Sequence, residues 1–164
     1  MEKRIAIVMG SKSDMPIVDA AIQTLKEFGV GFSVRVLSAH RTPDEAAGFA
    51  RRARGEGFGA IIAVAGKAAA LPGALAACST LPVIGVPVKS SALDGMDALL
   101  SMVQMPPGIP VATVAIDGAK NAALLAMSVL SVADEALAAK LDAYRKQLAA
   151  DVFAANVEIS QQYS

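Results

Sequence analysis

Short apolar runs alternate with helix-like segments five times along this chain. The runs are mostly apolar, which is typical of parallel strands that are covered on both faces of a sheet. We expect strands over residues 4–9, 31–37, 60–65, 83–88 and 111–116. Strands that alternate with helices over short connections require right-handed crossovers. The sequence therefore predicts an α/β fold, a three-layer doubly wound parallel sheet.

Residues that favour helix ends lie between the predicted strands. Asp14 is placed to cap a helix that has Pro16 in its first turn and ends at Gly29. Thr42 is expected to cap the next helix, which begins with Pro43. Further helices are expected over residues 68–77, 93–103, 121–132 and 134–151.

The last predicted helix has one apolar stripe. Its members recur at helical spacing: Leu137, Leu141, Tyr144 and Leu148. We interpret the stripe as core or subunit packing rather than as part of a ligand site. The tail after Phe153 is expected either to wrap a neighbouring subunit or to be disordered. The chain is thus predicted to be a single catalytic domain, 1–164, in which the C-terminal helix and tail from about residue 134 serve subunit packing.

The charge balance excludes some classes of partner. Fifteen basic and fifteen acidic residues cancel among 164, so no electrostatic footprint for nucleic acid or an anionic membrane surface is expected. Hydrophobic residues reach 54% and alanine is abundant, which indicates that apolar surface is buried between subunits of an oligomer. The nearly apolar stretch 58–77 is interrupted by Lys67 and Pro72, which argues against a membrane span.

The number of cysteines bears on the cellular compartment and on metal binding. The one cysteine, Cys78, excludes an intramolecular disulfide, and together with one histidine it leaves no cluster with zinc-ligand spacing. The start of the chain leads directly into a strand-like run rather than a signal peptide. We therefore expect a cytoplasmic protein that holds no metal.

Two loops carry most of the functional information. Residues 10–14 (GSKSD) follow the first predicted strand, and residues 38–43 (SAHRTP) follow the second. Both loops should lie at the carboxyl edge of the sheet, where α/β folds of this kind bind ligands. The first loop matches neither the dinucleotide fingerprint nor the Walker pattern. Hydroxyl groups and backbone N–H groups at helix starts suit an anionic ligand, so the sequence predicts an active site here.

The loop residues suggest specific roles. Ser11 and Ser13 can donate to a phosphate or sugar, and Asp14 can accept from ribose hydroxyls. His40, the only histidine, suits proton transfer, and the guanidinium of Arg41 matches phosphate oxygens. The alternatives are that 10–14 is a purely structural junction and that His40 is an ordinary surface residue.

A third loop adds a possible positive charge. Gly66 ends the third predicted strand, and Lys67 follows it directly. A solvated loop lysine is the ordinary interpretation. If the side chain points inward, it offers its charge to a carboxylate or to carbon dioxide.

These motifs together resemble one family. The segments that carry the resemblance span nearly the whole chain: 9–14, 38–43, 71–73, 85–88, 103–106 and 121–126. The chain is similar to the N5-carboxyaminoimidazole ribonucleotide mutases of purine biosynthesis, small octameric enzymes with a flavodoxin-like fold. The resemblance implies that Ser11, Asp14 and Arg41 bind the nucleotide, that Ser13 and Ser38 help to hold its phosphate, and that His40 handles the proton. Gly66 and Lys67 are assigned to the substrate site as well.

The implied reaction moves a carboxylate from the exocyclic nitrogen of the ribonucleotide to ring carbon C4, with no metal and no organic cofactor. The resemblance further implies a cytoplasmic homo-octamer whose partner is a small ribonucleotide, with no nucleic acid and no membrane.

Two alternatives remain open from the sequence. The mutases usually carry glycine at the position of Lys67 and a second histidine at that of Ala70. The related 5-aminoimidazole ribonucleotide carboxylases, which use free CO2, resemble this chain at both positions and in the short connection 117–121. A nucleotide-binding module without catalysis is the other alternative, because a fold alone does not dictate function.

Overall fold

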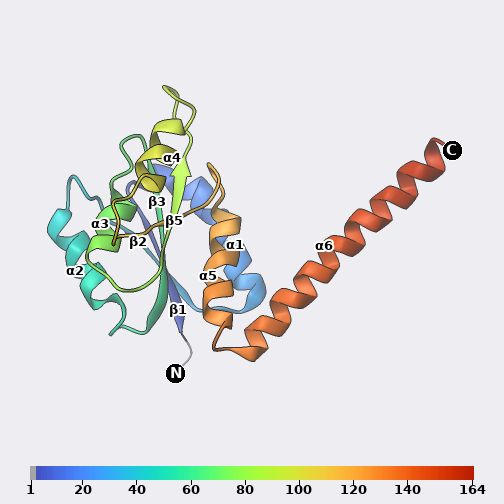
Figure 1. Cartoon of the computed structure of the whole chain (residues 1–164), viewed down its shortest axis with the longest axis horizontal. Helices are drawn as coiled ribbons and strands as arrows, with labels where there is room; N and C mark the ends of the chain where they lie inside the picture. Colours follow the sequence, from blue (N-terminus) through green and yellow to red (C-terminus); the bar gives the residue numbers. More distant parts are fainter. Residues whose placement is uncertain (1–2) are drawn as a thin grey trace. The chain divides into compact units, whose positions relative to one another are not determined.

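The computed structural model describes residues 3–164, which form one five-stranded parallel sheet with helices on both faces (Figure 1). The strands lie in the order β2-β1-β3-β4-β5. They are β1 (Arg4–Met9), β2 (Phe32–Val36), β3 (Phe58–Gly66), β4 (Val83–Val88) and β5 (Ala112–Thr113). In the middle of the sheet Ile7 lies opposite Val34 on one side and Ile62 on the other. This strand order is flavodoxin-like, and it confirms the predicted fold.

The helices connect the strands by crossovers. They are η1 (Lys12–Asp14), α1 (Met15–Phe28), α2 (Pro43–Ala53), α3 (Leu71–Ala77), α4 (Met96–Val103), α5 (Ala119–Ser131) and α6 (Glu135–Gln162). Helices α1 and α5 lie on one face of the sheet, and α2 and α3 lie on the other (Figure 1). The chain divides into two compact units, one ending at Leu130 and the other running from Ser131 to Ser164.

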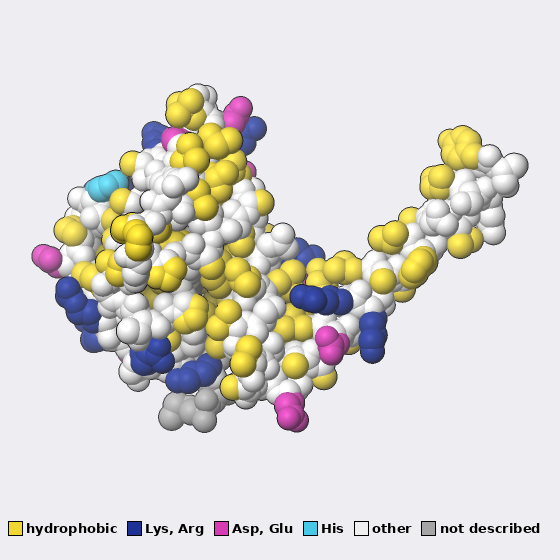
Figure 2. Space-filling model, viewed as in Figure 1, with side chains coloured by type: hydrophobic (Ala, Val, Ile, Leu, Met, Phe, Trp, Pro, Cys, Tyr) yellow, Lys and Arg dark blue, Asp and Glu magenta, His cyan; other side chains and the backbone are white. Residues whose placement is uncertain are grey.

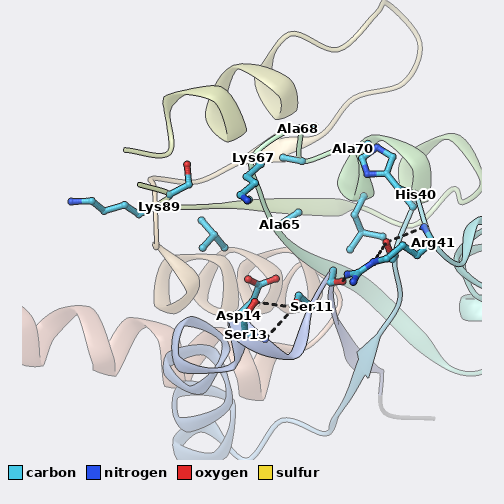
Figure 3. A pocket seen from close by; sticks show the side chains of 18 of the residues that line it. Ser11, Ser13, Asp14, His40, Arg41, Ala65, Lys67, Ala68, Ala70 and Lys89 are labelled. Atoms are coloured by element: carbon cyan, nitrogen blue, oxygen red, sulfur yellow. Dashed lines mark hydrogen bonds between the residues drawn. The ribbon is translucent and has the colours of Figure 1, made fainter. Parts of the chain in front are cut away.

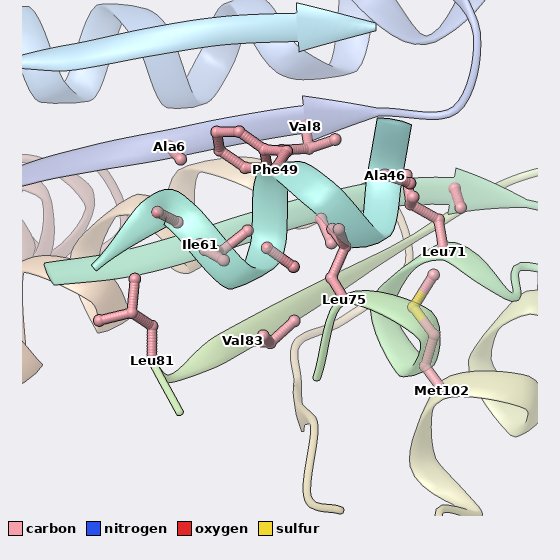
Figure 4. Close-up of a cluster of buried hydrophobic side chains, with 14 of the residues drawn as sticks. Ala6, Val8, Ala46, Phe49, Ile61, Leu71, Leu75, Leu81, Val83 and Met102 are labelled. Carbon is pink, nitrogen blue, oxygen red and sulfur yellow. The ribbon is translucent and has the colours of Figure 1, made fainter. Parts of the chain in front are cut away.

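A hydrophobic cluster fills the space between the sheet and α2, α3 and α4 (Figure 4). Ala6 and Val8 face this cluster from β1, so the alternating Ile5 and Ile7 face α1 and α5. The Phe49 and Phe58 rings meet edge to face with centroids 5.9 Å apart. Large buried side chains of this kind each contribute about 1.5–3 kcal/mol. This rigid core holds the strand ends at which the loops emerge.

Helix starts differ from the expected ones where the backbone enters the left-handed region. Helix α3 begins at Leu71 rather than at residue 68, because Lys67 and Ala69 have φ values of 55° and 45°. Helix α4 begins at Met96 rather than at 93, after Asp94 and Gly95 at 52° and 90°. Helix propensity predicts neither of these late helix starts.

The fifth strand is shorter than predicted. Only Ala112 and Thr113 pair with β4, instead of residues 111–116. The chain then turns, with the Gly118 N–H donating to the Ala115 carbonyl at 2.9 Å, while the Asp117 N–H still donates to the Pro87 carbonyl of β4 at 2.8 Å.

Helix α6 is longer than predicted. It runs without a break to Gln162, so the expected end at 151 is wrong and the tail after Phe153 is helical. The Asp134 carboxylate caps its start by accepting from the Leu137 N–H at 2.9 Å. Within residues 3–164 no helix combines the length and the hydropathy needed to cross a membrane.

Candidate active site

A pocket of about 690 Å³ opens at the carboxyl edge of the sheet, where the order of the strands reverses between β1 and β3 (Figure 3). Doubly wound sheets bind their ligands at this switch point. The loops that follow β1, β2, β3 and β4 line it. All eight residues predicted from the sequence lie on its wall: Ser11, Ser13, Asp14, Ser38, His40, Arg41, Gly66 and Lys67.

The loop after β1 folds into the short helix η1 before α1 begins. The Ser11 hydroxyl accepts from the Ser13 N–H at 3.3 Å and from the Ser13 hydroxyl at 2.8 Å. Asp14 occupies the N-cap position of α1, but its carboxylate makes no capping hydrogen bond, so the predicted capping role is wrong. The carboxylate instead points into the pocket (Figure 3).

Partial burial perturbs the ionisation of Asp14. Loss of solvent raises the pKa of this carboxyl above its ordinary value of 3.8, and hydrogen bonds with Ser11 and Ser13 oppose that rise. An acceptor that is poorly solvated in the free protein gains most from a ligand that brings hydroxyl donors. The Asp14 carboxylate is therefore placed to accept hydrogen bonds from a ligand in the pocket.

The loop after β2 is held by hydrogen bonds around Ser38. The Ser38 hydroxyl accepts from the backbone N–H of Arg41 at 3.2 Å and from its Nε at 3.3 Å. The Thr42 hydroxyl accepts from the Ser38 N–H at 2.9 Å and donates to the Ser38 carbonyl at 3.2 Å. Thr42 therefore does not cap α2 through its side chain, contrary to expectation, because its hydroxyl closes this loop instead.

Arg41 joins the two predicted loops, and His40 beside it exposes its imidazole to the pocket. Arg41 Nη2 donates to the Gly10 carbonyl at 2.9 Å. His40 lines the same pocket and is solvent-exposed, as Figure 2 shows by its position on the surface. Among the described residues its ring has no hydrogen-bond partner, so both ring nitrogens are available to a ligand.

The loops after β3 and β4 complete the wall. Backbone around Ala68–Ala70 follows Lys67, and Lys89, Ser90 and Ser91 follow β4. The Lys89 N–H donates to the Asp117 carboxylate at 2.9 Å, and its ammonium lies 3.4 Å from Asp94.

Ser90 was missed as a site residue. Its Oγ is buried and has no hydrogen-bond partner within residues 3–164, although the residue lines the pocket. The one signal in the sequence is its place in the loop that follows the predicted strand 83–88.

The fold and the pocket define a flavodoxin-like α/β protein with a ligand site at the switch point of its sheet, and comparisons with known proteins make the class specific. A family model described as AIR carboxylase matches residues 4–151. The chain belongs to this family.

Curated relatives share about half of the sequence. An N5-carboxyaminoimidazole ribonucleotide mutase from Brucella melitensis is 57% identical over 148 residues, which cover 89% of this chain and 91% of that protein. The mutase from Pyrococcus abyssi is 54% identical over 145 residues, covering 88% and 83%. The mutase from Methanocaldococcus jannaschii is 50% identical over 159 residues, covering 97% and 99%.

A solved structure has the same fold. The crystal structure of Treponema denticola PurE superposes with a TM-score of 0.88 at 29% identity, covering 96% of this chain and 98% of that one. The long C-terminal helix is therefore part of the shared architecture, since the match extends over nearly both chains.

Proposed function

We propose that this chain is an N5-carboxyaminoimidazole ribonucleotide mutase of purine biosynthesis. It converts N5-carboxyaminoimidazole ribonucleotide to 4-carboxy-5-aminoimidazole ribonucleotide. The observation that carries the proposal is identity of 50–57% to mutases over most of their length, joined to a pocket that gathers His40, Arg41 and the hydroxyls of the first two loops.

The reaction balances without a redox partner. The N–CO2 bond breaks, the nitrogen takes up a proton, and the electron-rich C4 then attacks the carbon of the released CO2. Loss of the C4 proton restores the aromatic ring. One proton is added and one is removed, so a single imidazole, that of His40, can donate to nitrogen and be restored from C4.

Confinement is the main catalytic device in this scheme. The CO2 intermediate is neutral and small, and it must stay beside C4 until the new bond forms. Holding two reactants in contact can offset about 7–11 kcal/mol of barrier. Ala65, Ala68 and Ala70 supply small apolar groups to the wall on the β3 side.

The remaining residues bind the nucleotide. Arg41 and Ser38 present a guanidinium and a hydroxyl that suit phosphate oxygens. Ser11 and Ser13 add hydroxyl donors, and the Asp14 carboxylate accepts from the ribose. Gly66 and Lys67 belong to the substrate site on the opposite wall.

Use of free CO2 is the alternative reaction, because the carboxylases also carry a basic residue at the position of Lys67 and no histidine at that of Ala70. The relatives favour the N-carboxylated substrate. Purified protein is offered either that nucleotide or 5-aminoimidazole ribonucleotide with bicarbonate, and both rates of product formation are followed. The proposal expects higher efficiency with the N-carboxylated nucleotide. Higher efficiency with bicarbonate would identify a carboxylase, and no turnover of either would leave a non-catalytic binding module.

We further propose a cytoplasmic homo-octamer in which the whole chain acts as one catalytic unit and α6 serves subunit packing. Hydrophobic side chains gather on the exposed face of α4 (Figure 2). The side chains of Leu93, Met96, Leu100 and Val103 are 49–60% exposed. Patches of this kind on soluble proteins mark contact surfaces.

Helix α6 carries a second such surface. Its apolar stripe repeats every eleven residues, or about 3.67 residues per helical turn, and its later members within the helix are exposed: Leu148, Val152 and Ile159. Sedimentation velocity of the wild-type chain tests the octamer directly. A smaller assembly would contradict it.

A further inference from the structure

Lys67 has a backbone conformation that is unfavourable for a residue with a long side chain. Its φ of 55° lies in the left-handed region, where glycine or asparagine is the ordinary choice and where a long side chain raises the free energy. Ala69 is also left-handed, at 45°, and its N–H donates to the Gly66 carbonyl at 3.1 Å. Strain of this kind is concentrated at ligand sites.

Lys67 differs from the other cations of the pocket in having no partner. The Arg41 guanidinium is fixed by Gly10 and Ser38, at 2.9 and 3.3 Å. The Lys89 ammonium is paired with Asp94 at 3.4 Å. In residues 3–164 the Lys67 ammonium has neither a hydrogen bond nor an ion pair. A ligand can therefore neutralise the charge of Lys67 without breaking a contact of the protein.

The side chain of Lys67 points into the pocket. Figure 3 shows its ammonium directed from the β3 side toward the space above Asp14, whereas Arg41 approaches from the loop after β2. The two positive charges, one fixed by hydrogen bonds and one unpaired, thus face the pocket from different walls. A mononucleotide with one phosphate and one carboxylate presents two anionic groups that match this division.

We propose that Lys67 is the residue that binds the migrating carboxylate of the substrate, and that it sets the preference of the site for carboxylated over bare nucleotide. The inference rests on the proposed function and deepens it. The group leaves the exocyclic nitrogen as neutral CO2 and rejoins at the adjacent ring carbon, so the carboxylates of the substrate and of the product lie close together. A lysine ammonium is a compact charge on a flexible stem, and it can follow that movement, whereas a guanidinium fork fixes one orientation.

The test compares two nucleotides on matched variants. Calorimetry measures the affinities of 4-carboxy-5-aminoimidazole ribonucleotide and of 5-aminoimidazole ribonucleotide, which lacks the carboxylate but keeps the phosphate. Lys67→Met removes the charge and keeps the length of the side chain. It is expected to lower the affinity for the carboxylated nucleotide about tenfold or more, because one charge-assisted hydrogen bond is lost. The affinity for the bare nucleotide should fall less than twofold. Lys67→Arg is expected to recover part of the lost preference.

Lys89→Met is the matched control, since this lysine lines the same pocket but is already paired with Asp94. It should leave the ratio of the two affinities unchanged. Equal weakening of both nucleotides by Lys67→Met would place the ammonium on the phosphate and overturn the inference. No weakening of either would overturn it as well. If wild-type protein bound neither nucleotide, the proposed function itself would fail, and this outcome is distinct from the other two.

Discussion

The guanidinium of Arg41 joins two loops that are 31 residues apart, because its Nη2 donates to the Gly10 carbonyl at 2.9 Å. The same side chain contacts the Ser38 hydroxyl through Nε at 3.3 Å. These contacts orient the guanidinium at the mouth of the pocket before any ligand binds, so little side-chain entropy is lost on binding.

Replacing Arg41 tests its assignment to the phosphate. Arg41→Ala is expected to weaken nucleotide binding by about tenfold or more while the rate at saturation changes far less, since the phosphate does not react. Arg41→Lys keeps the charge but loses the fork, and we expect an intermediate affinity. Initial rates over a range of substrate concentrations separate KM from kcat. A kcat that falls while KM stays constant would place Arg41 at the reacting atoms instead.

Asp14→Asn separates stability from binding. Because burial raises the folded-state pKa of Asp14, the folded protein binds this proton more tightly than the unfolded chain does. The Asp14 contribution to stability therefore rises as the pH falls from above the folded pKa toward the ordinary value of 3.8, and the charged form opposes folding at neutral pH. The variant should unfold at the same or a higher temperature at pH 7 and lose this part of the pH dependence.

The binding effect of Asp14→Asn has the opposite sign. An amide oxygen accepts more weakly than a carboxylate, so the nucleotide affinity should fall about tenfold. Thermal unfolding between pH 3 and 8 and calorimetry at pH 7 provide the two measurements. A variant that lost stability at pH 7 and kept full affinity would show that the carboxylate is structural.

Ser90→Ala tests the unpartnered hydroxyl. The Ser90 Oγ is buried without a hydrogen bond, which costs the free protein about 1 kcal/mol or more. We expect the variant to be as stable as wild type or more stable in denaturant unfolding, and to bind nucleotide a fewfold more weakly. Ser91→Ala, at the next position of the same loop, is the control. Lower stability with unchanged affinity would show that the hydroxyl has a structural partner.

The sheet could be predicted because its signals are local. Runs such as 4–9 and 83–88 are almost wholly apolar and match β1 and β4 residue for residue. Pro16 and Gly29 mark the ends of α1, and Gly29 adopts the left-handed φ of 71° that its predicted role requires. Because the carboxyl ends of parallel strands share one edge, the loops of the pocket could be brought together from topology alone.

Other features could not be predicted, because a side chain can bond with one of several partners and the sequence does not reveal which. Asp14 and Thr42 both occupy N-cap positions, yet each side chain is used elsewhere. The left-handed backbone at Lys67 and Ala69 is not expected of these residue types, so the late start of α3 could not be predicted. Ser90 belongs to no motif, and only the folded chain shows that its hydroxyl lacks a partner.

The central claim is that the imidazole of His40 carries the proton during carboxylate transfer. The most direct measurement compares His40→Asn with wild type, following both nucleotide affinity by calorimetry and conversion of the N-carboxylated nucleotide to the C4-carboxylated one. If His40 transfers the proton, the nucleotide affinity of the variant stays within about threefold of wild type. Product formation falls by about 100-fold or more, as expected for loss of a general acid–base. Turnover at the wild-type rate in His40→Asn would contradict it.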